Sequence, residues 1–233
     1  MNQNAEEQVL CFDKKYFLDD AYKAESDTAT LIKIIHTSGI TKYVPRSEAE
    51  TSDTLLQLIP YCVFSQKNEE TGFLFEKLLV YRRGKTGSED RLHDKWSLGF
   101  GGHINPEDSD ACLRYAKFVP GGVAKFCLRR EITEELANLS SDSTIVNTGI
   151  VLYDTSTPVS SVHLGWVFAI QVTDSTPIAA NEDCIRDLQW VSIDDLNSKA
   201  WSGKLESWAS RLAKKFLEAR FFHNVKAELK KST

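Results

Sequence analysis

Apolar residues gather into short runs along most of the chain, and polar or glycine-rich segments separate the runs. The runs that are rich in aromatic and β-branched residues predict strands at residues 59–64, 73–81, 148–153, 162–172 and 187–193. A polar segment between the first two of these runs predicts a hairpin-type loop. The glycine-punctuated segment 96–104 predicts extended chain.

Two segments instead repeat their apolar residues at helical spacing. Residues 120–136 carry an i, i+4, i+8 stripe at Leu128, Ile132 and Leu136, which predicts a helix with one face in a core. Residues 204–221 predict a C-terminal helix whose apolar face holds Leu205, Trp208, Leu212 and Phe216. A short helix is expected to begin near residue 193, where two aspartates lie at the favourable N-terminal end.

The first 57 residues have a less regular pattern. Residues 9–12 and the apolar run 31–35 have the length of strands, residues 16–24 suit one or two helical turns, and residues 46–53 suit a linker or an exposed helix start. We therefore expect an N-terminal extension at 1–57, packed on a main domain at 58–233.

Composition narrows the class of protein. The chain has 233 residues, 42% hydrophobic and 26% charged, with a net charge of -5. This composition is typical of a globular protein, and no basic tract suggests binding to a nucleic-acid backbone. The five cysteines form no C-x-x-C pair, and no apolar run is long enough to span a membrane. We expect a cytoplasmic protein and leave open whether it forms a homodimer.

The chemistry of the chain centres on three glutamates in the predicted helix 120–136. Glu131, Glu134 and Glu135 are spaced i, i+3 and i+4, which places them on one helix face. Converging anions repel one another unless a cation lies among them, and hard divalent ions such as Mg²⁺ prefer oxygen ligands. The alternative is a solvated acidic face, which is a common fate of glutamates on helices.

Two segments around these glutamates resemble the Nudix box. They are Gly101-Gly102-His103-Ile104-Asn105-Pro106-Glu107-Asp108 and Arg130-Glu131-Ile132-Thr133-Glu134-Glu135. The family pattern is a Gly, five residues, a Glu, seven residues, and then R-E-U-x-E-E-x-G-U, where U is a bulky aliphatic residue. The resemblance implies the fold class α/β, as a Nudix-type α/β/α sandwich around a mixed β-sheet.

The chain departs from that pattern in two places. The gap of seven residues becomes 21 here, from Ser109 to Arg129, so an insertion separates the loop from the helix. This insertion leaves the roles of Glu107 and Asp108 open. Ala137 and Asn138 replace the glycine and the aliphatic residue that follow the helix in the family. Asn tolerates the left-handed conformation, so the helix is expected to end about one residue later.

The resemblance implies a metal-dependent hydrolase that cleaves a pyrophosphate bond in a nucleoside diphosphate linked to another group. Glu134 and Glu135 are then the expected direct ligands of Mg²⁺ or Mn²⁺. Glu131 either ligates the metal, or orients or deprotonates the attacking water. Arg130 is expected to pair with a carboxylate and fix its rotamer. At the glycine turn, Gly101 and Gly102 let the backbone approach the metal or a phosphate, and the carbonyl of Gly101 is a further candidate ligand.

Weaker candidates for substrate binding lie outside the helix. Glu182, next to Asp183, precedes the last predicted strand, where many Nudix enzymes have a metal ligand or general base, although loop carboxylates are often solvated. His103 follows the glycine pair and either contacts a phosphate or stabilises the loop, while His163 suits a structural role. A set of basic residues just before the box is either solvated or recognises phosphate. The set comprises Arg82, Arg83, Lys85, Arg91 and Lys95, and Arg83 and Arg91 are the candidates for substrate binding.

Two other functions compete with hydrolysis. A non-catalytic Nudix sensor that binds a nucleotide usually lacks one or more of the helix glutamates, and this chain has all three. An isoprenoid diphosphate isomerase shares the fold but needs a cysteine on a strand, whereas Cys127 lies in the predicted helix. The expected partner in the leading hypothesis is a small nucleotide-type molecule.

Overall fold

The computed structural model describes residues 6–84, 93–115, 122–139, 143–173 and 177–231. The chain divides into two compact units that interleave along the sequence. Unit 1 comprises residues 1–62, 100–132 and 145–168, and unit 2 comprises residues 63–99, 133–144 and 169–233. Strands β3 (Leu55–Gln66) and β9 (His163–Gln171) and helix α5 (Gly122–Glu135) each contribute residues to both units.

The sheet of unit 1 is built on β3. Strand β1 (Gln8–Asp13) is antiparallel to both β2 (Thr41–Pro45) and β3, and Cys11 is the partner of Lys42 on one side and Gln57 on the other. Strand β8 (Val146–Tyr153) pairs with β9. Every residue of β3 is buried, which explains its near-continuous apolar sequence.

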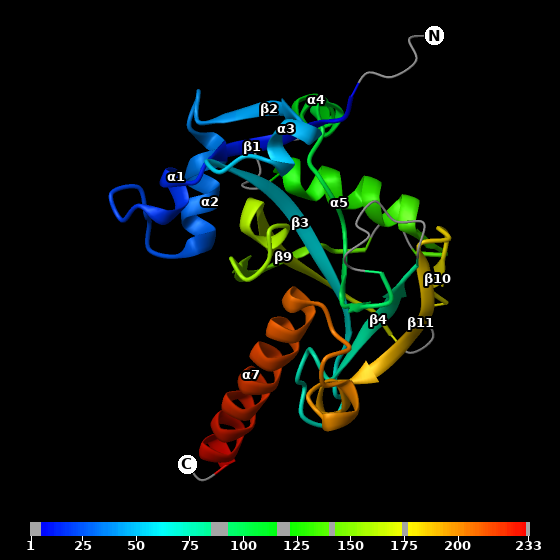
Figure 1. The fold of residues 1–233 in the computed structure, drawn as a ribbon. Coiled ribbons are helices and arrows are strands. Elements are labelled where there is room, and N and C mark those ends of the chain that lie inside the picture. The colour runs from blue at the N-terminus through cyan, green and yellow to red at the C-terminus, as the bar shows by residue number, and fades with distance from the viewer. Residues whose placement is uncertain (1–5, 85–92, 116–121, 140–142, 174–176, 232–233) are drawn as a thin grey trace. The chain divides into compact units, whose positions relative to one another are not determined.

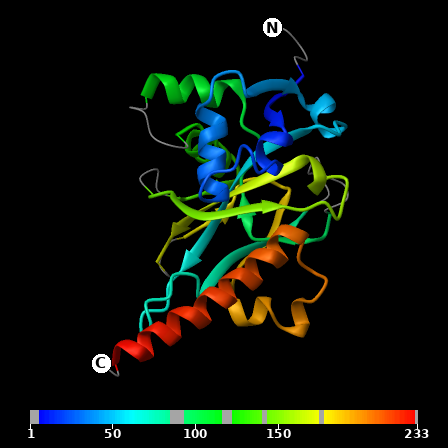
Figure 2. The same ribbon diagram turned by 90° about the vertical axis from the view of Figure 1, so that its left-hand side faces the viewer.

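The helices of unit 1 are α1 (Lys15–Leu18), α2 (Asp27–His36), α3 (Arg46–Glu50), α4 (Pro106–Tyr115) and most of α5, with the short 3₁₀ helix η2 (Ser160–Val162). Of the α-helices, α2 and α4 are not predicted by the sequence. Helix α2 lies against β8 (Figure 2). The prediction of a strand at 31–35 is wrong, because Ser26 caps α2 by accepting from the Ala29 N–H, and Leu31 and Ile34 bury one helical face. Helix α4 begins in the glycine-loop segment at Pro106 and continues into the gap as far as Tyr115.

The sheet of unit 2 has the order β11-β4-β3. Strand β4 (Lys77–Arg83) is antiparallel to the end of β3, to β5 (Trp96–Ser97) and to β11 (Ile185–Ser192) (Figure 1). Short strands β7 (Leu136–Ala137) and β10 (Ala179–Ala180) pair separately, and β6 (Gly99–Phe100) pairs with β3. Helices α6 (Ile193–Leu196), η3 (Lys199–Trp201) and α7 (Ser207–Lys231) follow β11.

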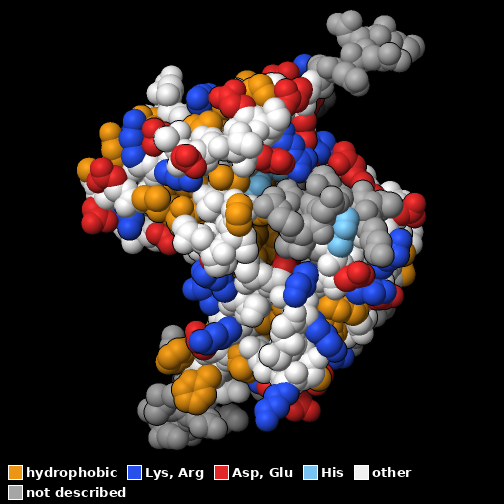
Figure 3. All heavy atoms as spheres, in the orientation of Figure 1, with side chains coloured by type: hydrophobic (Ala, Val, Ile, Leu, Met, Phe, Trp, Pro, Cys, Tyr) orange, Lys and Arg blue, Asp and Glu red, His pale blue; other side chains and the backbone are white. Residues whose placement is uncertain are grey.

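Most predicted elements are confirmed, with shifted bounds. The predicted stripe at Leu128, Ile132 and Leu136 is buried, and so is the face of α7 at Leu212 and Phe216. Helix α7 extends past the predicted end, and its Phe221 and Phe222 are 65% and 64% exposed. Hydrophobic side chains (orange) reach the surface at the lower left of Figure 3. The fold class is α/β, as predicted. The boundary at residue 57 stays a prediction. Among the described residues, no helix has the length and apolar character needed to cross a membrane.

Candidate active site

The glycine turn of unit 1 lies directly on one glutamate of α5. Gly101 has a φ of 139°, and a Cβ there would lie 2.3 Å from the carbonyl oxygen of Pro60, so only glycine fits. A Cβ on Gly102 would lie 2.6 Å from Oε1 and 2.8 Å from Oε2 of Glu131. The backbone of Gly102 therefore packs against the Glu131 carboxylate with no space between them for a side chain.

Arg130 ties this turn to two carboxylates. Its Nε and Nη2 donate to Oδ1 and Oδ2 of Asp108 at 3.0 and 2.9 Å, and its Nη1 donates to Oε1 of Glu131 at 2.7 Å. Nη2 also donates to the carbonyl of His103 at 3.0 Å. Burial lowers the pKa of Arg130, but the hydrogen bonds to Asp108 and the charge of Glu131 outweigh it and raise the pKa above its ordinary value. Arg130 thus fixes the Glu131 rotamer and stays charged.

The two acids whose roles the insertion left open have different environments. Asp108 is 3% exposed, and besides Arg130 its Oδ2 accepts from the backbone N–H of Asn105 at 2.9 Å. Asn105 therefore precedes α4 as in a capping box: Pro106 takes the first helical position, and the Asp108 carboxylate accepts the Asn105 N–H. Glu107 is exposed on α4. The Asn-Pro-Glu-Asp pattern signals a helix start, but nothing local in the sequence identifies Asp108 as the partner of Arg130.

The two histidines meet at the glycine turn. Nε2 of His103 lies 3.4 Å from Nε2 of His163, and Nδ1 of His163 donates to the carbonyl of Val159 at 2.7 Å. That donation leaves Nε2 of His163 to accept from His103. Burial, followed by the charge of Arg46, holds the pKa of His103 well below its ordinary value. His103 is therefore neutral at pH 7, and the pair links the turn to the start of β9.

In unit 2, a second loop is fixed to the C-terminal end of α5. The backbone N–H and side-chain Nδ2 of Asn181 donate to the carbonyls of Glu135 and Glu134, each at 2.9 Å. The last carbonyls of a helix need partners from outside it, so Asn181 acts as a cap. Glu134 is exposed and Glu135 is half-buried. The helix ends at Glu135, earlier than expected, and Asn138 adopts the left-handed conformation with a φ of 66°.

Glu182 and Glu135 lie near the same cysteine. Sγ of Cys184 donates to Oε2 of Glu182 at 3.1 Å. Burial, the hydrogen bond to Glu182 and the charges of Glu182 and Glu135 raise the pKa of the Cys184 thiol to about 12, against a smaller opposing effect of Arg83. Cys184, a residue that sequence reasoning did not single out, is thus bonded to Glu182 and lies within the electrostatic influence of Glu135 and Arg83.

The basic set before the box separates into different pairs. Nε of Arg83 donates to Oε2 of Glu206 at 3.0 Å, whereas Arg82 pairs with Asp187 at 2.6 Å and Asp94 at 3.4 Å. Lys95 donates to the carbonyl of Gly203 at 2.8 Å. Arg91 and Lys85 lie outside the described residues. Among the described members of this set, Arg83 is the one whose charge acts on the same side chains as that of Glu135.

The donor set on α5 suits a hard divalent cation. Glu131, Glu134 and Glu135 supply carboxylate oxygens from one continuous helix, and the missing Cβ of Gly102 opens the space that the Glu131 carboxylate fills. Within the part of the chain that the structure describes, no three acidic, histidine or cysteine side chains already converge on one point. Binding a metal would therefore require rotation of the exposed carboxylates toward it.

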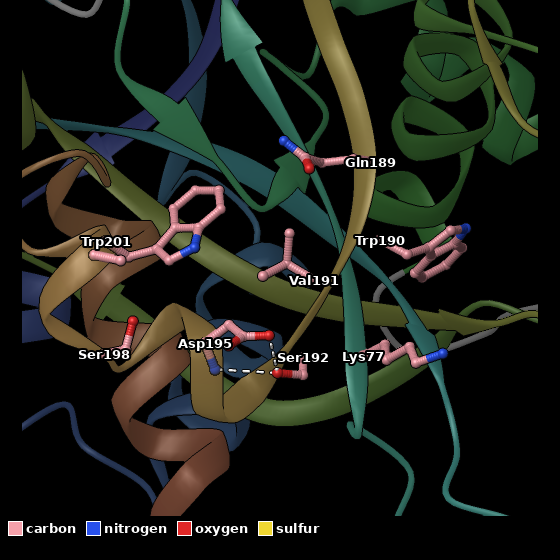
Figure 4. A pocket seen from close by; sticks show the side chains of 9 residues that line it. Lys77, Gln189, Trp190, Val191, Ser192, Asp195, Ser198 and Trp201 are labelled. Atoms are coloured by element: carbon pink, nitrogen blue, oxygen red, sulfur yellow. Dashed lines mark hydrogen bonds between the residues drawn. The ribbon is translucent and has the colours of Figure 1, made fainter.

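A pocket of about 410 Å³ lies elsewhere in unit 2 (Figure 4). Gln189 and Val191 of β11 line it, together with Asp195, Ser198 and Trp201. Asp195 is engaged with the cap of α6, because it accepts from the Ser192 hydroxyl at 2.6 Å. None of the sequence-predicted site residues lines this pocket, so it is distinct from the candidate active site.

Comparison with known proteins supports a single family. No family model matches the chain. Protein YmaB of Bacillus subtilis is 31% identical over 164 residues, which span 70% of this chain and 72% of YmaB. The crystal structure of Tm1382, described as a Nudix hydrolase, matches with a TM-score of 0.61 at 23% identity, over 91% of this chain and all of Tm1382.

A second structure agrees with the first at a lower score. The Nudix hydrolase from Alicyclobacillus acidocaldarius matches with a TM-score of 0.50 at 14% identity, over 69% of this chain and 90% of that protein. The resemblance to the Nudix family and the predicted fold are thereby confirmed. The chain therefore has the Nudix hydrolase fold and belongs to one family with YmaB of Bacillus subtilis.

Proposed function

We propose that this protein is a metal-dependent hydrolase that cleaves a pyrophosphate bond in a nucleoside diphosphate linked to another group. The observation that carries the proposal is the setting of Glu131. Its carboxylate rests on the Gly102 backbone and is held by Arg130, at the start of a run of three glutamates on α5. A merely solvated acidic face needs neither a glycine at that contact nor an arginine that fixes the rotamer.

The same residues can hold the metal that the Nudix fold implies. Glu134 and Glu135 are the proposed direct ligands of Mg²⁺ or Mn²⁺, and Glu131, earlier on the same helix, is a further candidate ligand. A divalent ion bound there supplies charge neutralisation of the pyrophosphate and lowers the pKa of a coordinated water.

The protein residues then have distinct tasks in hydrolysis. Arg130 keeps Glu131 in one rotamer, so the helix presents its carboxylate without reorganisation. The water oxygen forms a bond to phosphorus, the bridging P–O bond breaks, and the departing phosphoryl oxygen takes the electron pair. We assign the water proton to Glu182, which Asn181 and Cys184 hold near Glu135.

A substrate panel tests the proposal. ADP-ribose, dinucleoside polyphosphates, NADH and nucleoside triphosphates are each incubated with the protein and Mg²⁺ or Mn²⁺, and phosphate and nucleotide products are identified by chromatography. We expect metal-dependent cleavage of a phosphoanhydride bond in at least one compound that carries a nucleoside diphosphate. Tight binding of a nucleotide with no product from any compound would instead support a sensor domain.

A further inference from the structure

A buried acid from the far end of the sequence holds Arg83. The side chain of Glu206 is 6% exposed, and its two oxygens are both engaged: Oε2 accepts from Nε of Arg83 at 3.0 Å, and Oε1 accepts from the Ser97 hydroxyl at 2.6 Å. The backbone N–H of Glu206 also donates to the carbonyl of Trp96 at 3.0 Å. These three contacts within unit 2 hold the Glu206 carboxylate in one orientation toward Arg83.

The backbone places Arg83 against the loop that carries Glu182. Arg83 is the strand partner of Ile185, and the N–H of the next residue, Gly84, donates to the carbonyl of Cys184 at 2.6 Å. A Cβ on Gly84 would lie 2.8 Å from the carbonyl oxygen of Asp183, so the strand and the loop are in direct contact. Arg83 is thus held at the same loop that supplies Glu182 and Cys184.

Charge interactions agree with this placement. Arg83 and Glu135 act with opposite sign on the Cys184 thiol, and they also act with opposite sign on the buried phenol of Tyr81. Both groups are therefore near enough to act electrostatically on the same two side chains. The side chain of Arg83 is 31% exposed, so a ligand at Glu135 has access to it.

The neighbouring pair on the same strand provides a contrast. Arg82 faces the other side of β4 and pairs with Asp187, and these side chains are 38% and 50% exposed. An ion pair with that exposure contributes little to stability or order. Arg83 differs because its partner is buried and is itself held by a hydroxyl.

We propose that Glu206 is a positioning residue that holds the Arg83 guanidinium beside Glu135, where Arg83 receives a phosphoryl oxygen of the substrate. The assignment rests on the proposed hydrolase function and extends it, because it names the protein cation that binds the diphosphate. Arginine suits this task because its planar fork matches phosphate oxygens. Glu206 acts only through Arg83 and makes no contact with substrate.

Binding of a non-hydrolysable probe tests the assignment independently of turnover. The full chain is titrated with methylenediphosphonate at saturating Mg²⁺ by calorimetry, as wild type, Arg83→Gln, Glu206→Gln and the double variant. We expect Arg83→Gln to weaken binding roughly tenfold, since one charge-assisted contact is lost. Glu206→Gln should weaken it about fivefold by loosening Arg83, and should add nothing in the Arg83→Gln background.

Asp187→Asn is the matched control, because it removes the acid partner of the adjacent arginine and asparagine tolerates the positive φ of 51° at that position. It should leave binding unchanged. If Glu206→Gln does not fold, Glu206→Asp replaces it and should bind with intermediate affinity. Where the panel shows turnover, Glu206→Gln should raise KM with kcat nearly unchanged, as expected for lost uniform binding.

Three results would overturn the assignment: no binding of the probe by the wild type, wild-type affinity in Glu206→Gln, or additive losses in the double variant. Failure of the proposed hydrolase function would give a different set of results. In that case no compound of the panel is cleaved, while the probe still binds and still depends on Arg83 and Glu206.

Discussion

Replacing Arg130 with methionine removes the guanidinium but keeps much of the side-chain volume. Asp108, whose side chain is 4% exposed, then loses the two hydrogen bonds at 3.0 and 2.9 Å and keeps the one from the Asn105 N–H. Breaking a buried ion pair by removing one partner costs about 3–5 kcal/mol. Because one hydrogen bond to the carboxylate survives, we expect a loss of about 3 kcal/mol in the free energy of unfolding.

Urea denaturation followed by tryptophan fluorescence measures this loss, provided that the m-value stays the same. The double variant Arg130→Met/Asp108→Leu is the diagnostic partner, because it removes the stranded charge as well. It should recover part of the lost stability. A loss below about 1 kcal/mol in Arg130→Met, or an additional loss in the double variant, would show that Asp108 does not depend on Arg130.

Other substitutions probe separate parts of the account. Gly102→Ala puts a Cβ within 2.8 Å of the Glu131 carboxylate, so thermal unfolding should show a destabilisation of about 1–3 kcal/mol. Any measured turnover should also fall. An unchanged stability and rate would mean that the backbone of Gly102 does not pack tightly on Glu131. Asn181→Ala removes the side-chain cap on α5 and should cost about 1 kcal/mol in the same assay, with Asn224→Ala on the exposed side of α7 as a neutral control. Burial raises the pKa of Cys11 from 9.0 to about 12, so the unfolded thiol ionises first and stability should fall as pH rises from 9 to 12. Cys11→Ala should flatten that fall, and an equally steep fall would exclude Cys11 as its source.

The sequence predicts the parts of this fold that have local patterns. Helix α5 follows from a stripe of spacing four, and the three glutamates follow from their positions on it. The run 31–35 was misread because five apolar residues suit a strand or a buried helical face equally well. The cap at Ser26 and the burial of Leu31 and Ile34 decide for the helix.

The site residues that sequence reasoning missed are defined by distant partners. Arg130 and Asp108, which lies in the first turn of α4, are 22 residues apart in the chain, and Arg83 and Glu206 are 123 apart. No periodicity or local motif joins such pairs, because strand pairing and loop closure bring them together only in the folded chain. Glu182 was a weak candidate for the same reason, since its link to α5 runs through Asn181.

We propose that the carboxylates of α5 carry out metal-dependent hydrolysis. The most direct test is the initial rate of phosphoanhydride cleavage as a function of Mg²⁺ for the wild type, Glu135→Gln and Glu218→Gln, an exposed glutamate of α7 that serves as the control. We expect a rate that saturates with Mg²⁺, falls roughly a hundredfold or more in Glu135→Gln, and is unchanged in Glu218→Gln. A Glu135→Gln rate equal to that of the wild type at every Mg²⁺ concentration would contradict it.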